Sequence, residues 1–489
     1  MSSSERILAS LLKAHGINHI VVAESARSSV LDRMLRADEA YHLYDARDER
    51  SAAYFALGVA LESGTPAAVL CSGLIGTSNA LPACAEAFYQ NVPLLILGEA
   101  KKEDREQIEV NFTAFGRVTR SCTSLAGKPE REQIVAVNRA ITDLTLFGTG
   151  PCALTYTGAD AADAEAEIPA IPALVREADE KEWEKYRGML ESAPQVVVCI
   201  GEDTHADPEK LRAFAAEYGA LLLTDGIPAS GMPEGGTDVR TLEAGSVTLK
   251  DGAVVLMFTD VPTGNPEKAF APGSGTRVWN IGPGGSFRDR MGALSTVFAM
   301  EDDDFLAAFP ADGSSPKAAA AAQLSTDGPA AELQAGIGTL LQKTAALYHD
   351  GVMMASNAVA ACGASRAGWA EDVRRPGGIL ENSCTGNISL FLGYLAGQGG
   401  GGLLLLNEQE FFQDMNALML RDITQGTRII VFTCGAAEDE AARYSRQIRE
   451  WAVSAGFLFA AASGTEEAEK EIDTLISSSE GPRVLHICI

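Results

Sequence analysis

Residues 48–58 have the sequence DERSAAYFALG, in which two acidic residues open a run of small and apolar side chains. Acidic side chains are favoured near the start of a helix, where the helix dipole is positive. The small residues that follow allow a helix to pack tightly against its neighbours. The stretch therefore predicts a buried helix over residues 51–62, with Glu49 at its start.

Short apolar runs alternate with helix-length segments on both sides of this helix. Alternation of this kind is typical of parallel sheets covered by helices on both faces. We therefore expect an α/β protein with three doubly wound parallel-sheet domains, over residues 1–165, 178–310 and 330–489. Strands are predicted at residues 19–23, 67–71, 92–98, 195–201, 220–225, 253–258, 277–281, 351–354, 402–406, 428–433 and 483–488, with 277–281 closing the second domain. Further helices are predicted at residues 5–15, 77–89, 178–190 and 437–457, and linkers at 159–167 and 311–329.

The composition argues against several classes of binding partner and of protein. The chain has 489 residues, of which 46% are hydrophobic and 21% charged, and its formal charge is −27. So acidic a surface repels nucleic acid and anionic membranes, and neither is expected as a partner. Nine cysteines without a CxxC pair favour a reduced, cytoplasmic protein over a disulfide scaffold or a zinc site. No apolar run approaches the roughly 18 residues that span a membrane.

Three further segments follow the Glu49 helix in order: CSG at 71–73, NALP at 79–82 and VPLLIL at 92–97. The whole succession resembles the pyrimidine-binding domain of thiamine-diphosphate enzymes. It is most similar to the 2-succinyl-5-enolpyruvyl-6-hydroxy-3-cyclohexene-1-carboxylate synthases of the menaquinone pathway, with acetolactate synthases a little further away. The resemblance implies that Glu49 hydrogen-bonds the aminopyrimidine ring of the cofactor and promotes formation of its ylid. It also implies cofactor contacts from Ser72 and Gly73. The alternative is that Glu49 is only a helix-start acid.

The loop after the first strand, ESARSS at 24–29, resembles the Pro-Gly-Ser-Arg-Ser substrate loop of the synthases, with Glu24 and Ser25 in place of proline and glycine. The resemblance implies that Arg27 and Ser28 bind a carboxylate of the substrate, which arginine can hold with two parallel hydrogen bonds. Alternatively, Arg27 is a solvated loop residue, and Ser28 or Ser29 caps the next helix.

The predicted strand at 402–406 and the helix after it resemble the metal-binding region of the family, but its chemistry is altered. Asn407-Glu408 replaces the Gly-Asp pair, and the sequence TCGA at 433–436 replaces Asn-Asn-x-Gly. The resemblance implies a Mg²⁺ ion on Glu408, with carbonyls near Cys434 and Gly435. It also implies diphosphate contacts from Gly435 and from Ser356 and Asn357, whose order is reversed relative to the family.

The altered region carries several acids close to where the diphosphate would lie. Glu408, Glu410 and Asp414 would repel its charges, and each uncompensated contact at 4 Å costs roughly 1–4 kcal/mol in partly solvated surroundings. The segment at 377–383, where the synthases have an arginine, contains no basic residue. The family's cofactor-binding mode is therefore disfavoured, and menaquinone synthesis is not expected.

Three functional interpretations remain open. The first is a lyase or transferase that uses thiamine diphosphate in an altered site to cleave or join a carbon–carbon bond of a 2-oxo acid. The second is a catalytically degenerate homologue that does not bind Mg²⁺-thiamine diphosphate and serves as a binding, regulatory or structural partner. In both, the resemblance implies a homodimer or homotetramer. The third is thiol chemistry at Cys71, Cys384 or Cys434, although no base lies beside these cysteines in the sequence.

Overall fold

The computed structural model describes most of the chain. The described residues are 4–100, 114–145, 149–158, 168–171, 180–201, 204–225, 237–238, 247–259, 270–271, 273–283, 291–309, 333–348, 351–356, 359, 373–374, 386–420 and 425–489. The predicted linkers at 159–167 and 311–329 lie outside them, as do Asn357 and Cys384. In the described part of the chain, no helix is long and apolar enough to cross a membrane.

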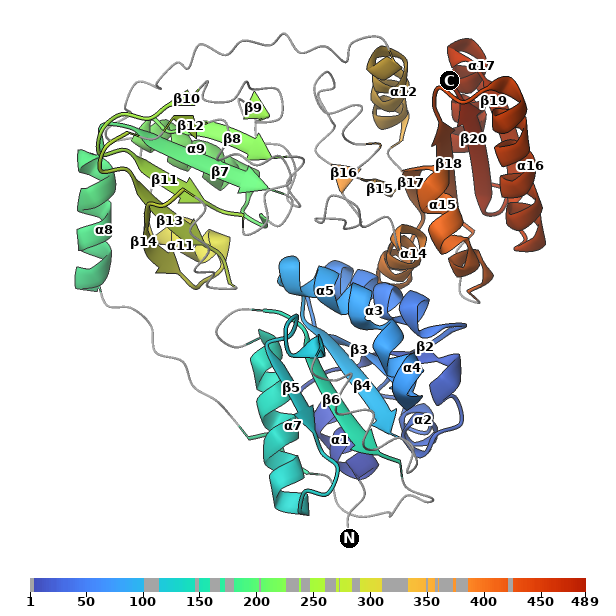
Figure 1. The fold of residues 1–489 in the computed structure, drawn as a ribbon, viewed down its shortest axis with the longest axis horizontal. Coiled ribbons are helices and arrows are strands. Elements are labelled where there is room, and N and C mark those ends of the chain that lie inside the picture. Colours follow the sequence, from blue (N-terminus) through green and yellow to red (C-terminus); the bar gives the residue numbers. More distant parts are fainter. Residues whose placement is uncertain are drawn as a thin grey trace.

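The first domain is built on a six-stranded parallel sheet with the order β2-β1-β3-β4-β6-β5 (Figure 1). One face packs against α1, α2 and α7, and the other against α3 and α5. The strands are β1 His19–Ala23, β2 His42–Ala46, β3 Ala67–Ser72, β4 Leu94–Ala100, β5 Ser121–Ser124 and β6 Cys152–Thr157. The helices are α1 Ser4–Ala14, η1 Glu24–Ala26, α2 Val30–Arg36, α3 Glu49–Ser63, α4 Gly73–Asn79, α5 Leu81–Tyr89 and α7 Glu130–Thr145.

The prediction of one helix over residues 77–89 is wrong, because two helices cover this region. α4 ends at Asn79 and α5 begins at Leu81, with Pro82 in the first turn of α5. Proline lacks a backbone N–H and its ring collides with the carbonyl four residues earlier, so it is tolerated in a first turn and disruptive further inside a helix. The helical region also begins earlier than the predicted residue 77, at Gly73 directly after β3.

The second domain contains a six-stranded parallel sheet with the order β14-β13-β11-β7-β8-β9. Its strands are β7 Val196–Gly201, β8 Leu221–Asp225, β9 Thr237–Asp238, β11 Val254–Met257, β13 Arg277–Ile281 and β14 Leu294–Phe298, beside a separate pair, β10 Val247–Thr248 and β12 Phe270–Ala271. The helices are α8 Glu180–Ser192, α9 Pro208–Tyr218 and α11 Asp302–Ala308. The prediction that residues 277–281 close this domain is wrong, since β14 pairs with β13 beyond them.

The third domain has a six-stranded parallel sheet with the order β16-β15-β17-β18-β20-β19. Its strands are β15 Val352–Ala355, β16 Val373–Arg374, β17 Gly402–Asn407, β18 Thr427–Thr433, β19 Leu458–Ser463 and β20 Arg483–Cys488. The helices are α12 Leu333–Leu347, α14 Asn387–Gln398, α15 Glu408–Asp414, η3 Met415–Met419, α16 Glu438–Ser454 and α17 Thr465–Ser477.

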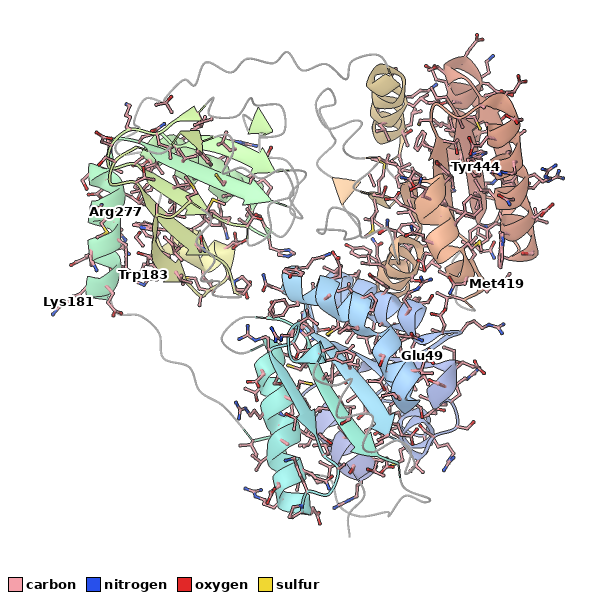
Figure 2. All side chains as sticks on the ribbon, viewed as in Figure 1. Glu49, Lys181, Trp183, Arg277, Met419 and Tyr444 are labelled. Carbon is pink, nitrogen blue, oxygen red and sulfur yellow. The ribbon has the colours of Figure 1, made fainter. Side chains whose placement is uncertain are left out.

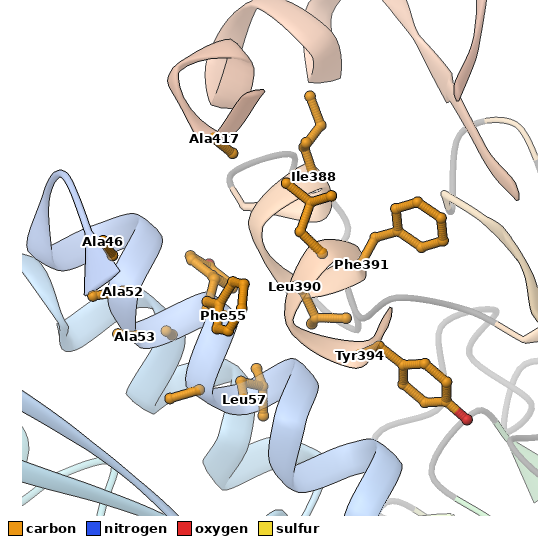
Figure 3. Close-up of a cluster of buried hydrophobic side chains, with 14 of the residues drawn as sticks. Ala46, Ala52, Ala53, Phe55, Leu57, Ile388, Leu390, Phe391, Tyr394 and Ala417 are labelled. Carbon is orange, nitrogen blue, oxygen red and sulfur yellow. The ribbon is translucent and has the colours of Figure 1, made fainter. Parts of the chain in front are cut away.

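The first and third domains meet where α3 crosses α14 (Figure 3). A glycine on each helix lets the two backbones touch. A Cβ atom added to Gly58 would lie 2.0 Å from the carbonyl oxygen of Leu390, and one added to Gly393 would lie 2.0 Å from that of Phe55. Apolar side chains of both helices surround the crossing and join the two domains in one hydrophobic core. The small residues of α3 therefore serve a contact between domains, in addition to packing on their own sheet.

Candidate functional site

The site in the first domain lies at the carboxyl end of its sheet, where the chain leaves β1 and β3 in opposite directions. In open parallel sheets, ligands usually bind in the crevice at such a point. Here the loop after β1 and the end of β3 are joined, because the backbone N–H of Ser72 donates to the hydroxyl of Ser25 at 3.1 Å. Gly73 follows with φ +76°, a left-handed conformation that favours glycine, and has open space where a side chain would be.

Glu49, labelled in Figure 2, is the first residue of α3 and is half-buried, and its carboxylate approaches α4. Its Oε2 accepts a hydrogen bond from the Asn79 side chain at 3.2 Å. A Cβ atom on Gly76 would lie 3.1 Å from Ser25 Oγ and 3.2 Å from Glu49 Oε1, so these two side chains approach the same spot on α4. Burial raises the pKa of the Cys71 thiol, and the charge of Glu49 adds to this effect. Cys71 is therefore a protonated, unreactive thiol.

Arg27 is already paired with acids of its own chain. Its Nη2 lies 2.9 Å from Asp45 Oδ2 and its Nη1 lies 3.3 Å from Glu24 Oε2. The other oxygen of Asp45 accepts from Arg36 Nη2. The carboxylate of Asp45, on β2, is thus already paired with the Arg27 guanidinium, and a substrate carboxylate would have to displace it.

Ser28 adopts φ +63°, and its N–H donates to the Asp32 carboxylate at 2.8 Å. The cap of α2 is Ser29, whose hydroxyl accepts from the Asp32 N–H at 3.1 Å. The Ser28 backbone is therefore committed to holding the turn before α2.

In the third domain the corresponding point lies between the ends of β15 and β17, because the chain leaves these neighbouring strands in opposite directions. The carboxylate of Glu410 lies there and bonds to both strand ends. Glu410 Oε2 accepts from the Ser356 hydroxyl at 2.5 Å and from the Asn407 N–H at 2.9 Å, while the Asn407 side chain accepts from the Glu410 N–H at 2.9 Å. Glu410 is only 2% exposed and Ser356 is fully buried. Burial raises the pKa of Glu410, and the bonds from Ser356 and Asn407 oppose this shift.

Glu408 belongs to a chain of polar contacts across the ends of β17, β18 and β20. Thr433 Oγ1 lies 3.3 Å from Glu408 Oε2 and 3.0 Å from His486 Nε2. Burial lowers the pKa of His486 to about 4, so the imidazole is neutral at pH 7. Cys488 Sγ lies 3.7 Å from both ring nitrogens, and burial raises the pKa of this thiol as well. The pair is therefore a neutral thiol beside a neutral imidazole.

Sequence reasoning missed this contact chain. His486 and Thr433 are 53 positions apart, and only strand alignment brings them together. The available signal was the alternation HIC at 486–488, which places a histidine and a cysteine on the same face of one strand. Gly435 has φ +68°, and its N–H donates to the Ile489 carbonyl at 2.8 Å.

Residues on either side of Glu49 bind the third domain of the same chain. Asp48 caps α3 through the Ser51 N–H at 2.9 Å, and its second oxygen accepts from the Asn416 side chain. Arg50 donates to the carbonyl of Gln413 at 2.8 Å. These contacts fix the start of α3 relative to η3, so the orientation of Glu49 depends on the third domain.

Asp414 lies fully buried at the same junction. It accepts from the Ser389 N–H at 2.6 Å and from the Ser389 hydroxyl at 2.9 Å. Burial raises the pKa of Asp414 to about 6. Arg50 Nη2 of the first domain lies 3.8 Å from Asp414 Oδ1, so this buried carboxyl also supports the contact between the domains.

These residues do not fit a cofactor that carries a diphosphate and Mg²⁺ in the manner that the resemblance implies. The Glu410 carboxylate is bonded to Ser356, one of the residues that the resemblance implies for the diphosphate, and its charge has the same sign as that group. The N–H of Gly435 is bonded to Ile489, and the hydroxyl of Ser356 to Glu410. Among the residues that the structure describes, no three His, Cys, Asp or Glu side chains are grouped so that they could hold a metal ion.

Comparison with known proteins finds a family model for the first domain and distant relatives over the whole chain. A family model described as "Thiamine pyrophosphate enzyme, N-terminal TPP binding domain" matches residues 3–115. The 2-succinyl-5-enolpyruvyl-6-hydroxy-3-cyclohexene-1-carboxylate synthase of Bacteroides fragilis is 23% identical over 98% of this chain and 93% of its own length. That of Phocaeicola vulgatus is 24% identical over 96% and 92%, respectively. The synthase of Bacteroides thetaiotaomicron is 43% identical over 90 residues, which are 18% of this chain and 16% of its own.

Solved structures confirm the predicted fold class. The thiamine diphosphate-dependent 4-hydroxybenzoylformate decarboxylase of Rhodococcus jostii RHA1 matches with a TM-score of 0.74 and 15% identity, over 99% of this chain and 98% of that one. The benzoylformate decarboxylase of Polynucleobacter necessarius matches with a TM-score of 0.73 and 12% identity, over 100% and 99%. The family model thus identifies residues 3–115 as similar to the N-terminal domain of thiamine pyrophosphate enzymes, while the rest of the chain is similar to the synthases in sequence and to the decarboxylases in fold.

Proposed function

We propose that this protein is a catalytically degenerate homologue of thiamine-diphosphate enzymes, which keeps the fold and acts as a binding or regulatory partner. The observation that carries the proposal is the contact chain of Glu408, Thr433 and His486. Mg²⁺ requires near-octahedral oxygen ligands. Among the described residues, the ends of β17 and β18 instead offer the Glu408 carboxylate, which contacts the Thr433 hydroxyl, and that hydroxyl also contacts the His486 imidazole. Imidazole suits zinc, copper or iron better than magnesium.

The proposal includes a homodimer or homotetramer, in which the first domain of one subunit faces the third domain of another. It also includes a cytoplasmic location, which is supported by seven free cysteines in the described part of the chain. The expected ligand is a small molecule. Arg27 and Ser28 remain candidate contacts for its carboxylate, provided that Arg27 releases Asp45.

A test combines stability with turnover. The purified full chain is heated with and without millimolar thiamine diphosphate and Mg²⁺, and pyruvate and 2-oxoglutarate are assayed for decarboxylation. A ligand that binds only the folded state must raise the melting temperature. We expect no rise and no turnover, and no difference between the wild type and Glu49→Gln. A rise together with turnover that requires Glu49 would refute degeneracy.

The second candidate is a lyase or transferase acting on a 2-oxo acid with an altered cofactor site. The setting of Glu49 favours it. The carboxylate is half-buried at the strand ends, accepts from Asn79, and faces Gly76, where there is no side chain. Thiamine diphosphate would supply the nucleophilic carbon, and Glu49 would hold a proton near it. Loss of turnover in Glu49→Gln, with ligand affinity unchanged, is the result that selects this candidate.

A further inference from the structure

Two hydrogen-bond donors at the ends of β15 and β17 converge on one point. The hydroxyl of Ser356, at the end of β15, and the N–H of Asn407, at the end of β17, both reach Glu410 Oε2, at 2.5 Å and 2.9 Å. Two donors at the ends of neighbouring strands suit an oxyanion. In this chain the oxyanion is supplied by the protein itself.

Three features hold the Glu410 carboxylate in place. Its side chain is almost fully buried, its backbone N–H is bonded to the Asn407 side chain, and it accepts from the Ser356 hydroxyl and the Asn407 N–H. If the side chain moved out, the buried Ser356 hydroxyl and the partly buried Asn407 N–H would lose this acceptor, which is unfavourable. An incoming anion would have to displace the carboxylate or lie beside it, and would then be repelled by Glu410 and by Glu408.

We infer that Glu410 is an internal anion that occupies the oxyanion position of the third domain and makes this protein exclude diphosphate groups. The inference deepens the proposed function and rests on it, since it names the residue that decides against phosphorylated ligands. A small residue at position 410 would leave the Ser356 hydroxyl and the Asn407 N–H without the carboxylate that they now bond. The variant should then accept diphosphate or phosphate.

The experiment uses the full chain and inorganic diphosphate as the probe, with a chelator present so that no metal contributes. Binding is measured by calorimetric titration in the wild type, Glu410→Ser and Glu410→Gln. Glu466→Ser, which removes the same charge from a side chain that is 90% exposed, is the matched control. We expect Glu410→Ser to bind at least about tenfold more tightly than the wild type and the control, since one like charge at close range is removed.

Glu410→Gln keeps the volume and removes only the charge, so a smaller gain is expected. If Glu410→Ser fails to fold, the gain in Glu410→Gln is the readout. Diphosphate binding by the wild type as tight as by Glu410→Ser, or no gain in any folded variant, would overturn the inference. Neither result bears on turnover, so the proposed function is judged separately by its own assay. Conversely, wild-type turnover with thiamine diphosphate would refute the proposed function, whatever inorganic diphosphate does.

Discussion

Replacing Gly58 by alanine tests the contact between the first and third domains. In an ordinary helix this substitution stabilises by about 1 kcal/mol, because alanine has the higher helix propensity. Here the new Cβ would lie 2.0 Å from the Leu390 carbonyl oxygen and 2.7 Å from the Tyr394 nitrogen. Ordinary contacts are ~3.5 Å, and the colliding atoms are backbone, which cannot rotate away. Overpacking of a core costs about 1–3 kcal/mol, so the collision outweighs the propensity gain.

We therefore expect Gly58→Ala to lower the free energy of unfolding by about 1–3 kcal/mol in urea. Gly188→Ala is the matched control, because Gly188 also lies within a helix, α8, but has no neighbouring atom within 4 Å of its added Cβ. The control should gain up to about 1 kcal/mol. If Gly58→Ala were as stable as the control, α3 and α14 would not cross as described. The contacts that orient Glu49 relative to the third domain would then be in doubt as well.

Three further predictions follow from charge and burial. Because burial raises the pKa of Asp414 from 3.8 to about 6, the folded state holds this proton more tightly than the unfolded state, and the wild type loses stability as the pH rises between these values. The stability of Asp414→Asn relative to the wild type should therefore rise by up to about 3 kcal/mol between pH 4 and 7. A difference that does not change with pH in urea titrations would contradict the shift. Asp45→Ala should lower the thermal stability more than Asp38→Ala, because Asp45 bridges two arginines, whereas the exposed pair of Asp38 with Lys13 contributes about 0–1 kcal/mol. Equal losses of stability in thermal unfolding would count against the pairing of Arg27 with Asp45. Cys71 and Cys84 should react with a thiol reagent only on unfolding, because burial raises both pKa values; fast labelling of either one, located by mass spectrometry, would show that the first core opens.

The alternating pattern predicts most of the central strands. β1 and β20 have the predicted bounds, whereas α3 begins at Glu49, two residues before the predicted start at Ser51. Central strands are buried on both faces, so their sequences are short apolar runs bounded by turn residues. Strands β2 and β19 were missed because they lie at sheet edges, where the side chains are partly exposed and the apolar run is broken.

The site was less predictable, because its decisive contacts join distant segments. The motif around residue 408 indicated an altered anion site, but a glutamate in a helix's first turn has the same sequence signal whether it faces solvent or a crevice. Only the strand order brings Ser356, 54 positions away, to the Glu410 carboxylate. The pairing of Arg27 with Asp45 was hidden for the same reason, since β2 was not recognised as the neighbour of β1.

The most direct test is a crystal structure of the protein grown with excess thiamine diphosphate and Mg²⁺. It should show the Glu410 carboxylate on the Ser356 hydroxyl and the Asn407 N–H, and no diphosphate at the ends of β15 and β17. A diphosphate at those strand ends, with Glu410 turned away and a metal ion on Glu408, would contradict this interpretation.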